Sequence, residues 1–248
     1  MKLLIINFRQ KKNRIFFYIF FLLTQFTFAQ SQKVTVEDVF RRYLLTGEKS
    51  MAEMVINSND SLYSLFCKAT LTNDETEAID LYSKFILLNP KYGLAEAYLY
   101  RGIKYNSLDS AELSIADLDK SIEYNDKEPY AYYFRGSSYK MLNQYEKSIE
   151  DFSKAIKLNP TFDLAYFMRG NSYFSKKDYD KAILDYSKTL TLDKKSEQAY
   201  IMRCLVYEAI NEYKKAIADW NEVIKMKSYD NTERAKKFIE RVSEKMKN

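Results

Sequence analysis

The sequence predicts an all-α protein built from repeated helical hairpins. Two short segments recur with a step of 34 residues, and apolar residues within each step follow helical spacing. The 248 residues also include only five glycines and three prolines, too few to punctuate the many short strands of a β-rich protein. Long helices joined by short turns are therefore expected.

The two recurring segments define the repeat. One begins with Ala-Tyr and ends in Arg-Gly in three of its four copies, and the other begins with Asp followed by a large apolar residue. Their copies lie at residues 97–102, 131–136, 165–170 and 199–204, and at residues 117–122, 151–156, 185–190 and 219–224. An earlier copy of the second segment, residues 81–86, is separated from the next by two extra residues near Gly93 and Leu94.

Each unit of 34 residues holds two helical segments. Counted from position 1, apolar and small residues occupy positions 4, 8 and 11, and then positions 17, 20, 24 and 27. A single hairpin of this kind cannot bury its apolar face, but a stack of five can. The units are residues 59–92, 95–128, 129–162, 163–196 and 197–230.

Over residues 59–230 this pattern resembles the tetratricopeptide repeat family. The family's large residue at position 4 is tyrosine in four units, its small residue at position 8 is glycine in three, and its proline at position 32 remains in two. These residues are Tyr98, Tyr132, Tyr166 and Tyr200; Gly102, Gly136 and Gly170; and Pro90 and Pro160. The resemblance implies a right-handed superhelical solenoid whose first helices line a concave groove.

The pattern of residues 1–29 predicts a signal peptide. Basic residues without any acid precede an apolar run from Ile15 to Phe28, and small residues occupy the positions that signal peptidase reads, Thr27 and Ala29. The run is shorter than the roughly 20 residues needed to cross a bilayer, which favours a cleaved signal over a retained anchor. We therefore expect an exported protein that is periplasmic, at the cell surface or secreted.

Loss of this segment would change the charge of the chain. The whole sequence carries a net charge of +5, with 39 basic and 34 acidic residues. The predicted signal contains five basic residues and no acid, so 34 residues of each sign remain. A neutral chain lacks the positive field that draws proteins to phosphate backbones. No nucleic-acid partner is expected.

Two residue counts limit the chemistry. The absence of histidine excludes His-based catalysis and imidazole metal ligands. Cys67 and Cys204 lie three to four units apart, too far for a disulfide, and are expected to be buried thiols. The sequence therefore predicts no enzyme activity, no cofactor and no metal.

The segments that flank the repeats are predicted to be helical caps. Residues 30–58 are expected to form a linker and one capping helix, residues 34–45, against the first unit. Residues 231–248 are expected to form a C-terminal capping helix whose basic side chains allow weak contact with anionic lipid. Interspersed acids, Glu233 and Glu240, favour a solvated helix instead.

A repeated arginine at position 7 accompanies a repeated aspartate at position 23. A ladder of structural ion pairs between the two helices of each unit is favoured, because buried charges are tolerated chiefly when paired. The alternative is a row of guanidinium groups that binds an acidic ligand. The residues are Arg101, Arg135, Arg169 and Arg203, with Asp117, Asp151, Asp185 and Asp219.

Position 15 ends the first helix of each unit. Asp109, Asn143 and Asn211 suit a left-handed residue at this place. Lys177 departs from the pattern, so a looser turn is expected there.

The concave face is the candidate binding site. The resemblance implies that positions 2, 5, 9, 12 and 13 face it, and too many of them are apolar for a solvated surface. The alternative is that these side chains pack on neighbouring helices. The candidate groove residues are Leu99, Ile103, Tyr133, Lys140, Met141, Phe167, Asn171, Phe174, Ile201 and Leu205.

The resemblance implies a non-catalytic scaffold or adaptor that binds a protein or peptide partner in this groove. Of the polar residues with which some relatives hold a C-terminal carboxylate at positions 5 and 9, only Asn171 is present, so that mode is not expected. A structural or assembly element that self-associates or supports an envelope complex is the alternative, and an enzyme or glycan-binding module is less favoured. The membrane is expected to matter only through the signal peptide, apart from the lipid contact above, and the oligomeric state stays open.

Overall fold

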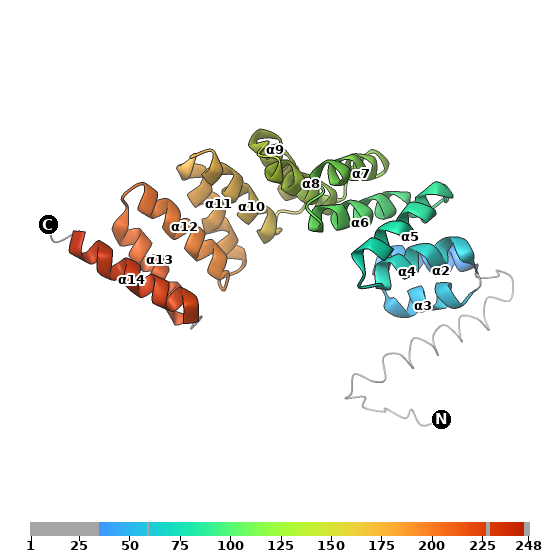
Figure 1. Cartoon of the computed structure of the whole chain (residues 1–248), viewed down its shortest axis with the longest axis horizontal. Helices are drawn as coiled ribbons and strands as arrows, with labels where there is room; N and C mark the ends of the chain where they lie inside the picture. The colour runs from blue at the N-terminus through green and yellow to red at the C-terminus, as the bar shows by residue number, and fades with distance from the viewer. Residues whose placement is uncertain (1–34, 59, 227–228, 246–248) are drawn as a thin grey trace, which may run out of the picture.

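The computed structural model describes residues 35–58, 60–226 and 229–245. All regular structure in these residues is α-helical, which confirms the predicted fold class, and Figure 1 shows the helices stacked in chain order from α2 to α14. The predicted signal peptide, residues 1–29, lies outside the described residues. The helices are α2 (Val36–Thr46), α3 (Lys49–Asn57), α4 (Ser61–Leu71), α5 (Glu75–Leu87), α6 (Leu94–Ser107), α7 (Ala111–Tyr124), α8 (Pro129–Met141), α9 (Tyr145–Leu158), α10 (Asp163–Ser175), α11 (Tyr179–Leu192), α12 (Glu197–Ala209), α13 (Tyr213–Lys225) and α14 (Tyr229–Lys245).

The repeat units fold as hairpins, each made of a first and a second helix. The pairs are α4 with α5, α6 with α7, α8 with α9, α10 with α11, and α12 with α13. From α6 to α12, each first helix also contacts the next first helix, whereas no two second helices of the described chain pack comparably closely. The first helices therefore form the inner layer of the stack and the second helices the outer layer.

Residues at position 15 end the first helices α6, α8, α10 and α12 in the left-handed conformation. Asp109, Asn143 and Asn211 have φ between 55° and 59°, as predicted. Lys177 has φ 61°, so the expected looser turn is wrong. The amide of Asp178 still donates to the carbonyl of Tyr173, as the corresponding amides do after α6, α8 and α12, and this bond holds the turn in place.

The repeated glycines allow one large side chain to pack directly on a helix backbone. A Cβ atom at Gly170 would lie 2.8 Å from the Tyr186 ring, and one at Gly136 would lie 3.1 Å from the Phe152 ring. Both rings are fully buried. In three hairpins, α6 with α7, α8 with α9, and α10 with α11, the glycine of the first helix is thus matched to the large residue at position 24 of the second helix, and this contact fills the centre of the hairpin.

The N-terminal end differs from the prediction of a single capping helix. Gly47, with φ 65°, ends α2, and a second helix, α3, follows it and packs on α4. The prediction missed α3 because it has only nine residues, of which only Ala52 and Val55 are buried. The two helices form an additional hairpin at the open end of the first repeat.

Aromatic packing joins this extra hairpin to the first repeat. Phe40 of α2 stacks on Tyr63, with ring centroids 4.4 Å apart, and meets Phe66 edge-on at 5.3 Å. It also lies against Gly93, whose φ is 88° and whose Cβ position is 3.1 Å from the Phe40 ring. The glycine in the two-residue insertion before α6 therefore makes room for Phe40.

The C-terminal end is covered by α14, which packs on α13. Ala235, Phe238 and Val242 are buried against Trp220. Both cysteines, Cys67 and Cys204, are buried free thiols, as predicted. None of the helices in the described part of the chain combines the length and apolar character needed to cross a membrane.

Replacing Lys177 with asparagine is expected to stabilise the protein. A lysine in the left-handed region costs about 1 kcal/mol relative to a residue that tolerates it, and two other units already use asparagine there. The free energy of unfolding should rise by about 0.5–1 kcal/mol in urea denaturation followed by circular dichroism. The matched control is Lys194→Asn in a turn without positive φ. An equal gain in both variants would contradict the backbone explanation.

Candidate functional site

In the four repeats from α6 to α13, the arginine binds the aspartate of its own hairpin through two parallel hydrogen bonds. The Nε and Nη2 atoms of the guanidinium donate to the two carboxylate oxygens over 2.7–2.9 Å in all four pairs. Each aspartate is buried, with an exposed fraction of 4–6%. Arg101 pairs with Asp117, Arg135 with Asp151, Arg169 with Asp185, and Arg203 with Asp219.

The remaining Nη1 atom of each arginine reaches the second helix of the preceding hairpin. It donates to the residue at position 25, a serine in three cases and Asp119 in the fourth, over 2.6–2.9 Å. The guanidinium also lies 5.6–5.8 Å from the ring centroid of the tyrosine at position 4. One side chain therefore joins three helices.

These contacts confirm the ladder of structural ion pairs. Burial opposes the charge of Arg135, but the hydrogen bonds that it donates to Asp151 and Asp119, with the negative charge of these carboxylates, outweigh burial and raise the pKa of the guanidinium. Three of the five guanidinium donors of each arginine bind the aspartate and the residue at position 25, and a tyrosine ring lies near the group, which favours a structural role over binding of an acidic ligand.

The candidate groove residues lie on the four inner helices α6, α8, α10 and α12, and they differ in accessibility. Leu99 has an exposed fraction of 6% and packs with Leu118 and Ala131, so a partner can reach little of it. Met141 lies at the other extreme, with 36% exposed. The remaining candidates are half-buried: Ile103, Tyr133, Lys140, Phe167, Asn171, Phe174, Ile201 and Leu205.

Several of these half-buried side chains also contact the second helices or the loops between units. The Tyr133 ring lies 5.7 Å from Phe152 and 5.0 Å from Phe162, between centroids. Burial raises the pKa of Tyr133. Packing on neighbouring elements therefore accounts for part of the apolar character of this face.

Phe167 and Phe174 come together on α10. Both pack against the cluster formed by Ala182, Tyr186 and Val206. The Asn171 side chain accepts a hydrogen bond of 2.8 Å from the Tyr186 hydroxyl. The asparagine thus helps hold the ring in the hairpin centre, while the two phenylalanines keep partly exposed edges.

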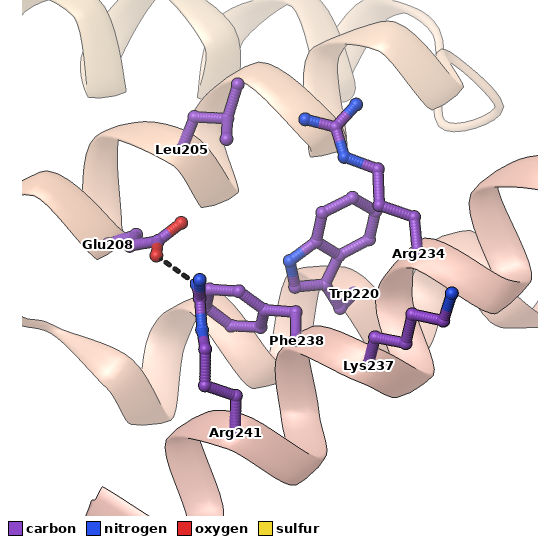
Figure 2. Close-up of a pocket in the computed structure, with 7 residues that line it drawn as sticks. All are labelled: Leu205, Glu208, Trp220, Arg234, Lys237, Phe238 and Arg241. Atoms are coloured by element: carbon purple, nitrogen blue, oxygen red, sulfur yellow. Dashed lines mark hydrogen bonds and ion pairs between the residues drawn. The ribbon is translucent and has the colours of Figure 1, made fainter.

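A pocket lies at the C-terminal end of the stack, where α12, α13 and α14 converge (Figure 2). Its volume is about 370 Å³. Two of its residues, Leu205 and Glu208, occupy positions 9 and 12 of the last repeat, which the family pattern assigns to the concave face. The lining residues are Leu205, Glu208, Trp220, Arg234, Lys237, Phe238 and Arg241.

Sequence reasoning recognised Leu205 and the basic residues of the last helix separately, but not as one site. Their convergence depends on the face of α14 that packs on α13, which Phe238 and Val242 determine. The one available signal was Trp220, which replaces the tyrosine, phenylalanine or leucine found at position 24 of the other units.

Comparison with known proteins agrees with this architecture. The profile of the tetratricopeptide repeat family matches residues 129–162 and 164–196. The chain is a tetratricopeptide-repeat protein. The part of this repeat protein that the structure describes contains no cluster of three or more Asp, Glu or Cys residues suited to hold a metal ion.

Solved structures share the fold of this tetratricopeptide-repeat protein. A crystal structure of MamA is 26% identical, with a TM-score of 0.61, and the match covers 67% of this chain and 96% of that one. MamA from Desulfovibrio magneticus RS-1 is 15% identical, with a TM-score of 0.60, covering 72% and 94%. TTC0263, a thermophilic TPR protein from Thermus thermophilus, is 15% identical, with a TM-score of 0.54, covering 71% and 96%. No curated protein sequence matches the chain.

Replacing Asp151 with alanine is expected to lower the stability strongly. The change leaves the Arg135 guanidinium half-buried without its bidentate partner, at a cost of about 3 kcal/mol or more. Thermal unfolding monitored by circular dichroism measures the loss.

The matched control is Asp119→Ser, because serine fills this position beside three of the other arginines. Asp119 is 53% exposed, so this change should cost less than about 0.5 kcal/mol. An unchanged melting temperature in Asp151→Ala would refute the ion-pair ladder as a stabilising element.

Proposed function

We propose that this tetratricopeptide-repeat protein is a non-catalytic scaffold that binds a peptide segment of a partner along its inner helices. Membership of the family supports protein binding in general. The observation that carries the finer proposal is the apolar surface of α8 and α10. At positions assigned to the concave face, Tyr130 and Leu164 remain about half exposed and Met141 more than one-third exposed.

This surface is supported by a rigid inner layer. The Asn106 amide donates to the Ser138 hydroxyl over 2.8 Å, and that hydroxyl donates to Ser114 over 2.9 Å. Ser148 and Ser172 make a similar 2.9 Å contact one unit later. Because consecutive hairpins are joined by these bonds as well as by the arginine ladder, the apolar side chains are held in place before a partner arrives, which limits the entropy lost on binding.

The proposal is tested by photo-cross-linking through residue 141 in cells, followed by identification of the captured protein. We expect one protein to be captured through this position, and the additional substitution Phe174→Gln to reduce the yield about tenfold by removing apolar contact area. The control substitution is Leu184→Gln, which changes an exposed leucine on the outer helix α11. Circular dichroism verifies that both variants are folded.

Equal capture by the two variants would place the interaction elsewhere than the inner face. Capture of a second copy of the same chain would favour the alternative, a self-associating assembly element.

We also propose that the protein is exported. Support comes from the basic start, the short apolar run and the small residues before Gln30, all in the sequence. N-terminal sequencing of the protein recovered from cells should begin at Gln30. Recovery of a chain that still begins at Met1 would contradict a cleaved signal.

A further inference from the structure

The C-terminal pocket combines an excess of positive charge with an aromatic floor. Three cations line it, Arg234, Lys237 and Arg241, but only one carboxylate, Glu208. Glu208 accepts a hydrogen bond from Arg241, so its charge is already compensated. Figure 2 shows this pair on one side of the pocket and Arg234 and Lys237 on the other.

Arg234 and Lys237 have no carboxylate within ion-pair distance among the described residues. Neighbouring lysines on the same helix behave differently, since Lys236 forms an ion pair with Glu233 at 2.9 Å. The pocket therefore retains two cations that no described carboxylate holds in an ion pair, since Glu233 acts on Lys237 only from beyond that distance. An anionic group that enters the pocket would meet a net positive potential.

The floor of the pocket is apolar and fixed in position. Trp220 and Phe238 lie with ring centroids 6.0 Å apart, and Trp220 is only 1% exposed. The Arg234 guanidinium lies 5.8 Å from the centre of the Trp220 ring, and the Arg241 guanidinium lies 5.4 Å from that of Phe238. Both arginines are thus held over aromatic faces, with hydrogen-bond donors left for a ligand.

We infer that this pocket binds an acidic peptide segment in which a large apolar side chain stands beside carboxylates. The apolar side chain would contact Leu205, the half-buried apolar residue of the lining, beside the closed pair of Trp220 and Phe238, and the carboxylates would bind Arg234 and Lys237. The inference rests on the proposed function, because Leu205 and Glu208 place the pocket at the end of the inner face. It adds the charge of the ligand and the place where that charge is recognised.

Concavity favours a peptide over a lipid surface as the occupant. The cations are exposed and line an open pocket of about 370 Å³ between three helices, which has the dimensions of one or two side chains. A bilayer would instead require a continuous basic face on the helix. On α14, the exposed Lys236 is paired with an acid, which weakens such a face.

The test uses the fluorescence of Trp220, the one tryptophan of the chain. The probe is the tryptophan-free peptide acetyl-Glu-Leu-Glu-Phe-Glu-amide, titrated into the full protein. We expect a saturable change in fluorescence. An analogue with glutamine in place of each glutamate should bind at least about tenfold more weakly, and the affinity for the acidic peptide should fall as salt is raised.

Two variants on the same helix distinguish the pocket from general charge. Lys237→Gln should weaken binding of the acidic peptide about fivefold, because it removes an unpaired cation that lines the pocket. Lys236→Gln removes the same charge one residue away, outside the pocket, and should leave the affinity unchanged. Circular dichroism controls for folding in both variants.

Three results would overturn the inference: no binding of the acidic peptide, equal binding of its glutamine analogue, or equal losses in the two lysine variants. Vesicles that contain phosphatidylglycerol form a separate arm, and a response to them that depends on Lys237, without a response to the peptide, would assign the pocket to lipid.

The peptide titration and the cross-linking experiment test the two proposals separately. If the pocket does not bind the peptide but capture through residue 141 persists, only the inference is wrong. If the peptide binds while capture through residue 141 fails, the pocket stands and the groove proposal is wrong.

Discussion

The bidentate bond between an arginine and a buried aspartate sets the geometry of every full repeat from α6 to α13. The same guanidinium binds the aspartate of its own hairpin and donates a hydrogen bond to the second helix of the preceding hairpin. The bonds that hold the two helices of a hairpin together therefore also fix how that hairpin packs on the preceding one. A lysine at this place could not make the same set of bonds, since its ammonium lacks the planar fork of donors that reaches two helices at once.

A consequence of this coupling is the regularity of the inner layer. Once the rotation of each first helix is fixed by its arginine, residues at equivalent positions must align along the stack. The half-buried aromatic residues of α8 and α10 follow from that alignment, with one edge packed on a second helix and the other directed to the inner face. The same residues thus stabilise the hairpin and shape the surface proposed for binding, so substitutions there can affect both properties.

The repeated part of the fold was predictable, because the residues that make each packing contact recur several times in the sequence. A glycine opposite a large side chain can be recognised when three copies agree, and an arginine opposite an aspartate when four do. Features that occur once were not predictable in this way. The short helix α3 lacks a repeat partner, and its two buried residues give too weak a pattern to distinguish it from a loop.

At Lys177, by contrast, the residue type alone gave a wrong prediction of the turn. Its residue type argues against a left-handed conformation, yet the chain adopts one there, because the hairpins on both sides impose the geometry. Tertiary packing therefore overrides local preference when neighbouring units agree. The burial of Leu99 could not be predicted from the sequence either, because it depends on packing against Leu118 and Ala131 of two other helices. The sequence therefore predicted that the candidate residues lie on the first helices of the hairpins, but not how exposed each of them is.

The two unpaired thiols have a consequence for redox chemistry. Burial raises the pKa of Cys67 to about 12 and raises the pKa of Cys204 as well. At neutral pH both side chains stay protonated, and only the thiolate attacks disulfides or reacts readily with oxidants. Neither sulfur is reachable from solvent. The protein thus carries two cysteines without presenting a nucleophile, and its folded chains can meet an oxidising environment without becoming cross-linked to one another.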